Sequence, residues 1–81
     1  MNGSNCNQAI NVSFTESKLV VYLVDGRELH VPLCWFPRLN SATKEQQNQW
    51  RLIGNGLGIH WESADEDISV SGLLRGERAP D

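Results

Sequence analysis

The hydrophobic pattern of the first half of the chain predicts three β-strands. Residues 10–14 follow the two-residue period of a half-buried strand. Residues 18–24 are rich in β-branched and aromatic side chains, which favours a second strand. Residues 27–31 are expected to form a third strand that ends at Pro32, because proline has no backbone N–H for a ladder. The pattern therefore predicts a three-stranded antiparallel meander.

The turn between the second and third strands decides which side chains share a sheet face. Asp25-Gly26 is the strongest hairpin signal in the chain, because glycine adopts a positive φ without strain. A two-residue loop would pair Leu23 with Glu28, whereas a three-residue loop over residues 25–27 with a glycine bulge would pair Leu23 with Leu29. We favour the three-residue loop, because it places these apolar side chains on one face: Leu19, Val21, Leu23, Leu29 and Val31.

The apolar period then changes to three, which predicts short helices. Leu33, Phe36 and Leu39 recur at this spacing, so a short helix is expected at about residues 34–40 with Pro37 in its first turn.

Thr43 and Gln46 have the spacing of a capping box, in which each side chain bonds the backbone N–H of the other residue. This motif predicts a second, polar helix over residues 44–50.

The remaining residues predict a second short hairpin and a C-terminal helical turn. Residues 51–53 and 59–61 are expected to pair across the glycine-rich connection at 54–58, and residues 63–67 are expected to form a loop. A last helix is expected from residue 69 to residue 74.

Ser69 is the expected N-cap of the last helix, Asp67 is expected to bind backbone N–H groups at its start, and Gly76 is expected to end it. The fold class is therefore a small single α+β domain over residues 10–76, with tails at 1–9 and 77–81.

Length, charge and cysteine content narrow the class of protein. Eighty-one residues correspond to one domain, and the net charge of −3 comes with seven scattered basic residues. A nucleic-acid binder usually needs a basic patch, so binding to nucleic acid by this domain alone is not expected. The longest apolar run, residues 19–24, cannot span a bilayer, and the start of the chain lacks a secretory pattern. We expect a cytoplasmic protein without membrane contact.

Cys6 and Cys34 are expected to be thiols in that compartment. Cys34 lies in an apolar stretch, which favours a small core residue.

No sequence pattern indicates catalysis, a metal or a cofactor. The glycines between residues 54 and 58 lack the spacing of a dinucleotide fingerprint and the lysine of a phosphate loop. His60 and Glu62 resemble the start of a zinc-deaminase signature, but its cysteine pair is absent. We therefore expect no catalytic residues, no metal and no cofactor.

The acidic residues are concentrated near the end of the chain. Glu62, Asp65, Glu66 and Asp67 lie within six positions and no basic residue separates them. A solvated loop explains this stretch, and so does a patch that meets a basic partner. Under the second interpretation the partner-binding residues are Glu62, Asp65 and Glu66.

A series of short motifs runs through residues 25–74. They are Asp25-Gly26-Arg27, Val31-Pro32-Leu33, Trp35-Phe36-Pro37-Arg38-Leu39, Ala42-Thr43, Trp50-Arg51-Leu52-Ile53-Gly54, Gly58-Ile59-His60-Trp61, Asp65-Glu66-Asp67-Ile68-Ser69-Val70 and Gly72-Leu73-Leu74. Together these motifs resemble the bacterial domain-of-unknown-function family 2442, and the resemblance, which runs from about residue 12 to residue 74, implies a small α+β domain. It also implies that relatives are often encoded beside a second small protein, and such a pair looks like a toxin–antitoxin module with this domain as the antitoxin. The family defines no catalytic residues.

The leading interpretation is a non-enzymatic bacterial module that binds a small protein encoded nearby, with the antitoxin of such a pair as its most specific form. Two alternatives stay open. One is a DNA-binding or transcription-regulatory accessory domain, and the other is an enzyme of unknown type.

Overall fold

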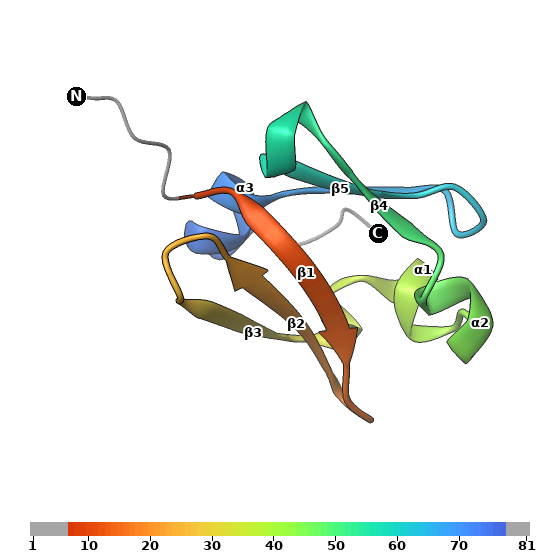
Figure 1. The fold of residues 1–81 in the computed structure, drawn as a ribbon. Helices are drawn as coiled ribbons and strands as arrows, with labels where there is room; N and C mark the ends of the chain where they lie inside the picture. Colours follow the sequence, from red (N-terminus) through yellow and green to blue (C-terminus); the bar gives the residue numbers. More distant parts are fainter. Residues whose placement is uncertain (1–6, 78–81) are drawn as a thin grey trace.

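The first half of the chain forms the predicted meander. In the computed structural model, which describes residues 7–77, its three strands lie in the order β1-β2-β3, and neighbouring strands are antiparallel (Figure 1). Pro32 is the last residue of β3, as its missing N–H requires. The strands are β1 (Ala9–Phe14), β2 (Lys18–Leu23) and β3 (Glu28–Pro32).

The apolar side chains predicted to share one face of this sheet do so, although the register differs by two residues from the predicted one. Val21 pairs with Leu29 instead of Val31. The loop has three residues as expected, but it comprises residues 24–26, and the Leu23 N–H donates to the Arg27 carbonyl at 2.8 Å. A shift of two residues leaves every side chain on its predicted face.

The second half of the chain builds another three-stranded antiparallel sheet, in the order β4-β5-β6. The predicted hairpin is present. The prediction of a loop over residues 63–67 is wrong, because Glu66 and Asp67 begin a third strand. This strand contains one buried apolar side chain, Ile68, so its sequence lacks the alternation of the first sheet. The strands are β4 (Trp50–Ile53), β5 (Gly58–Trp61) and β6 (Glu66–Ser69).

The helix expected at residues 34–40 is divided into two turns. Phe36 has φ −128° and ψ 82°, outside the helical region, because a residue before proline is sterically kept from it. The second helix ends at Gln47, earlier than predicted, and Trp50 already belongs to β4. The helical segments are the 3₁₀ turns η1 (Leu33–Trp35) and η2 (Gly54–Gly56) and the helices α1 (Pro37–Asn40), α2 (Lys44–Gln47) and α3 (Val70–Leu74). Within residues 7–77, no helix has the length and apolar character needed to cross a membrane.

The predicted caps of α2 and α3 are confirmed, with one exception. The Gln46 N–H donates to the Thr43 hydroxyl at 3.1 Å, and the Thr43 N–H donates to the Gln46 side chain at 2.9 Å. Ser69 accepts the Gly72 N–H at 2.8 Å. Asp67 does not cap α3, because it lies within β6 and its carboxylate contacts His60.

Gly76 ends α3 as predicted. It has φ +80°, its N–H donates to the Leu73 carbonyl, and the next N–H, that of Glu77, reaches the Gly72 carbonyl.

The tails expected at residues 1–9 and 77–81 fall largely outside the described residues, which exclude 1–6 and 78–81. Ala9 already belongs to β1 and is buried. Cys6 is among the residues outside the description.

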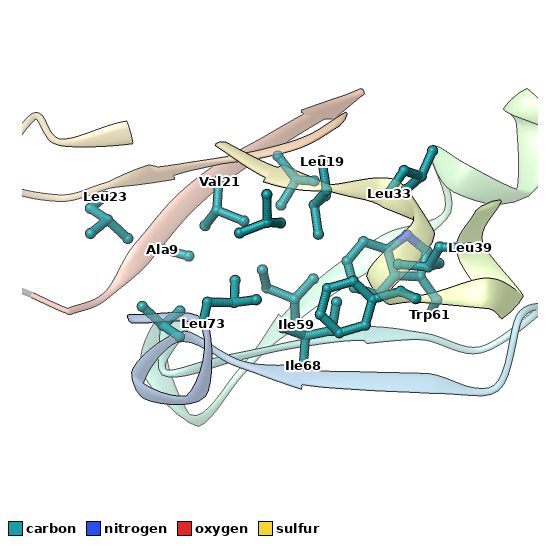
Figure 2. Packing of buried hydrophobic residues seen from close by; sticks show 14 residues of the cluster. Ala9, Leu19, Val21, Leu23, Leu33, Leu39, Ile59, Trp61, Ile68 and Leu73 are labelled. Carbon is teal, nitrogen blue, oxygen red and sulfur yellow. The ribbon is translucent and has the colours of Figure 1, made fainter. Parts of the chain in front are cut away.

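The hydrophobic core fills the space between the two sheets (Figure 2). Trp61 is completely buried there, and its indole N–H donates to the Gln47 carbonyl at 2.9 Å. The ring of Phe14 meets Trp61 edge-on, with centroids 6.1 Å apart. Cys34 is exposed, so its predicted place in the core is wrong. The core residues include Ala9, Val12, Leu19, Val21, Leu23, Val31, Leu33, Phe36, Leu39, Ile59, Trp61, Ile68, Val70 and Leu73.

We expect Val21→Ala to lower the free energy of unfolding by about 1–3 kcal/mol, because it leaves a cavity between the sheets. Urea unfolding followed by far-UV circular dichroism measures this change. Val24→Ala is the matched control, since Val24 is exposed and should change stability by less than about 0.5 kcal/mol. Equal effects of the two substitutions would contradict the assignment of the core face.

We expect Ser69→Ala to lower stability by about 1 kcal/mol, because the Gly72 N–H loses its acceptor at the start of α3. Thermal unfolding measures the loss. Ser71→Ala is the control, since Ser71 is exposed within the same helix. An unchanged melting temperature for Ser69→Ala would show that the cap does not stabilise the fold.

Candidate partner-binding surface

The predicted acidic residues lie on the turn between β5 and β6 and at the start of β6. We call residues 62–67 the acidic turn. The turn is closed by a hydrogen bond from the Asp65 N–H to the Glu62 carbonyl at 3.3 Å. Asp65 has φ +53°, which its short side chain tolerates better than most. The acidic turn therefore has a defined backbone conformation.

Arg38 reaches the acidic turn from α1. Its guanidinium donates to the Asp65 carbonyl at 2.5 Å and lies 3.5 Å from the Asp65 carboxylate. A second arginine, Arg51 on β4, lies 3.8 Å from the Glu62 carboxylate. Exposed pairs of this kind contribute little to stability, so the two arginines orient the turn more than they stabilise the fold.

Glu62 and Asp65 are the most accessible carboxylates of the predicted partner-binding set. Their side chains are 82% and 92% exposed despite the neighbouring arginines. Neither carboxylate is needed to fill the core, and both can meet another molecule without unfolding the turn.

Glu66 differs from these two residues because it is partly buried. Burial raises the pKa of its carboxyl above the ordinary value, and the positive charge of Arg38 opposes the rise. Glu66 is therefore less accessible to a partner than Glu62 and Asp65.

Asp67 faces a histidine that the sequence interpretation treated as an isolated strand residue. The Asp67 carboxylate contacts Nδ1 of His60, and the two residues pair across β5 and β6. Arg51 is the next residue in this row, because it pairs with His60 on β4. The contact was missed because β6 was not predicted, and a β5–β6 pairing would have placed the two side chains together.

Within residues 7–77, no group of three or more histidine, cysteine, aspartate or glutamate side chains could hold a metal ion.

The glycine-rich connection at residues 54–58 has a structural role. Gly56 has φ +88°, and a Cβ there would lie 2.5 Å from the Ala9 carbonyl oxygen. Its glycine lets η2 pack against the start of β1.

The surface has two other features besides the acidic turn. Strand β4 carries Leu52 and Ile53, which are 37% and 38% exposed, and Leu57 follows them as a third exposed apolar residue. A groove of about 460 Å³ runs between the end of β1 and α2. It is lined by Val12, Ser13, Phe14, Thr15, Glu16, Lys44, Gln47 and Asn48.

Comparison with known families identifies the domain. The family model described as "Protein of unknown function (DUF2442)" matches residues 9–79, nearly the whole chain. The chain belongs to the DUF2442 family. The resemblance seen in the sequence motifs is thus confirmed for the family itself.

Two solved structures share the DUF2442 fold of this chain. A crystal structure of a protein of unknown function from Rhodospirillum rubrum is 26% identical, with a TM-score of 0.77, and the match covers 91% of this chain and 92% of that one. A solution NMR structure of an uncharacterised protein from Chromobacterium violaceum is 31% identical, with a TM-score of 0.76, and covers 90% and 69%. Both organisms are bacteria. The search of curated proteins gave no match.

The raised pKa of Glu66 predicts a specific pH dependence. An acid whose pKa is higher in the folded than in the unfolded state destabilises the fold as pH rises through that interval. We therefore expect Glu66→Gln to be more stable than the parent at pH 7 and to lose this advantage at pH 3, where the parent carboxyl is protonated. Melting temperatures at the two pH values test this, with Glu45→Gln as the exposed control. A lower melting temperature for Glu66→Gln at pH 7 would mean that attraction to Arg38 outweighs burial.

Proposed function

We propose that this DUF2442 domain is a non-enzymatic protein-binding module that captures a basic protein partner through Glu62 and Asp65. The observation that carries the proposal is the exposure of these two carboxylates on an ordered turn, at 82% and 92% of their side-chain surface. Ordered charges need no rearrangement on binding, which lowers the entropic cost of association.

The net charge of the whole chain also supports a basic partner. The net charge is −3, and four carboxylates lie within the acidic turn. Arg38 and Arg51 offset part of this local charge, so the surface would act mainly through the association rate and the choice of partner.

The most specific form of the proposal is an antitoxin that binds the product of the adjacent gene. Membership of the family supports this form, because the resemblance implies that relatives are often encoded beside a second small protein. A cytoplasmic location follows from the same proposal.

A DNA-binding accessory role is the alternative that the test must separate. Two of the arginines, Arg38 and Arg51, lie beside carboxylates of the acidic turn, which reduces their attraction for phosphate. Nothing on this surface therefore favours DNA over a basic protein.

The double variant Glu62→Lys, Asp65→Lys should slow association with the product of the adjacent gene by about tenfold at low salt, because electrostatic steering is reversed. Stopped-flow or surface plasmon resonance kinetics measure the rate. The double variant Glu16→Lys, Glu45→Lys has the same charge change at exposed positions outside the acidic turn and serves as the control. Glu66 is left unchanged because it is partly buried.

Co-expression gives the biological readout for the same pair of variants. If the adjacent gene product inhibits growth, the parent chain and the control should restore growth and the acidic-turn variant should do so poorly. Equal association rates for the two double variants would contradict the role of the acidic turn. Binding to duplex DNA that weakens steeply with salt would favour the alternative role.

A further inference from the structure

Four strands of the two sheets are edges, and three of them carry features that discourage pairing with another strand. Strand β1 has a bulge between Ala9 and Asn11, and the Asn11 side chain accepts the Val12 N–H at 2.9 Å. Strand β3 ends on a proline and lies beside α3. Strand β6 carries two acidic residues. Bulges, prolines and charges are the usual means by which proteins protect sheet edges.

Strand β4 carries less of this protection. It has no bulge in its pairing with β5 and contains no proline, although it has one charged residue, Arg51, and lies beside β1. Its exposed residues include Leu52 and Ile53. Figure 1 shows β4 running from α2 towards η2. An exposed apolar edge of this kind is a template for a further strand.

The hydrogen-bonding pattern identifies which backbone groups of β4 are available. The Val70 N–H donates to the Leu57 carbonyl, so this carbonyl points towards the β6 side of β5, whereas the Leu57 N–H donates to the Gly54 carbonyl. Because these directions alternate along an antiparallel strand, Gly58 and His60 face β4 and bond Ile53 and Arg51. The N–H and C=O groups of Trp50 and Leu52 consequently point away from the sheet. Within residues 7–77, no hydrogen bond joins these outward groups to another segment.

We propose that β4 is the docking site for an extended segment of the basic partner, which adds to the second sheet as a fourth strand. This inference rests on the proposed function for the positive charge of the partner. The main-chain groups of Trp50 and Leu52 would supply the hydrogen bonds. The exposed side chain of Leu52 would pack against the apolar residues on one face of the added strand, whereas Ile53 points to the opposite face of the sheet.

We infer an antiparallel direction for the added strand, because both pairings of the second sheet are antiparallel. The position of the acidic turn then decides which end of the strand is basic. Glu62 lies beside the Trp50 end of β4, since Trp50 pairs with Trp61, whereas the apolar Leu57 follows the opposite end. A strand antiparallel to β4 brings its C-terminal end to Glu62. The segment therefore has alternating apolar residues followed by lysine or arginine, and this charge complementarity favours a basic partner over a second copy of the acidic chain.

Synthetic peptides test this geometry. The probe is Thr-Val-Thr-Val-Thr-Lys-Lys with blocked ends, and its controls are Lys-Lys-Thr-Val-Thr-Val-Thr and Thr-Val-Thr-Val-Thr-Glu-Glu. Titration into ¹⁵N-labelled protein should shift the amide signals of Trp50 and Leu52 most and slow their hydrogen exchange. We expect the probe to bind roughly fivefold more tightly than the reversed control, the equivalent of one exposed ion pair.

Leu52→Pro removes one outward N–H, and proline is tolerated at edge positions whose N–H faces solvent. This variant should weaken binding of the probe by about fivefold, the equivalent of one net hydrogen bond. Leu52→Thr keeps the N–H and should retain binding to within about twofold. His30→Pro is the matched control, because the Leu23–Arg27 bond places the His30 N–H on the outer side of β3. If Leu52→Pro fails to fold, the slowed exchange of the Leu52 amide in the parent decides the question.

Two results would overturn strand addition at β4. They are unchanged binding of the probe by Leu52→Pro, and amide shifts centred on Phe14 and the groove beside α2. A dimer in sedimentation experiments that Leu52→Pro abolishes would show that a second copy of the chain, and not a basic partner, pairs with β4. Equal binding of all three peptides at β4 would instead contradict the charge-based proposed function and leave strand addition standing. Slow capture of the adjacent gene product by Glu62→Lys, Asp65→Lys, together with normal capture by Leu52→Pro, would support the charge-based proposed function and contradict strand addition at β4.

Discussion

The burial of Trp61 holds the two sheets and α2 in one arrangement. A single three-stranded sheet with one apolar face is marginal alone, so each sheet depends on the other to cover that face. Trp61 lies on the central strand of the second sheet, meets Phe14 of the first sheet edge-on, and donates to the Gln47 carbonyl of α2. One side chain thus joins the three parts of the fold that the sequence separates by many residues.

This arrangement determines where the domain can meet other molecules. The core occupies the inner faces of both sheets, and the helical segments are short, so the edges, the turns and the outer faces remain accessible. Among these surfaces, the acidic turn and β4 are connected directly, because both adjoin β5. A partner that touches one of them is already close to the other.

The first sheet could be predicted from the sequence, whereas the second could be predicted only in part. The alternation of Leu29 and Val31 with Glu28 and His30 indicates which side chains of β3 face the core, but it fixes the strand register only to within two residues. The loop therefore began one residue earlier than expected while every face was right. Strand β6 has the single buried apolar residue Ile68, which is too weak a signal to distinguish a strand from a loop. Cys34 shows the same limit, since apolar neighbours in the sequence do not decide which side of a 3₁₀ turn faces solvent.

The position of the acidic turn could be read from local charge, but its shape could not. Arg38 lies 27 residues before Asp65, and only the folded chain brings its guanidinium to the turn carbonyl. The same arginine reduces the negative charge and defines the conformation that presents it. A turn held in this way loses little freedom when a partner binds, so two accessible carboxylates can select a partner that a mobile acidic segment of equal charge would bind less specifically. The arginines beside the acidic turn are therefore compatible with a binding role. They weaken its electrostatic attraction for a basic partner, but they also fix the orientation of its two accessible carboxylates.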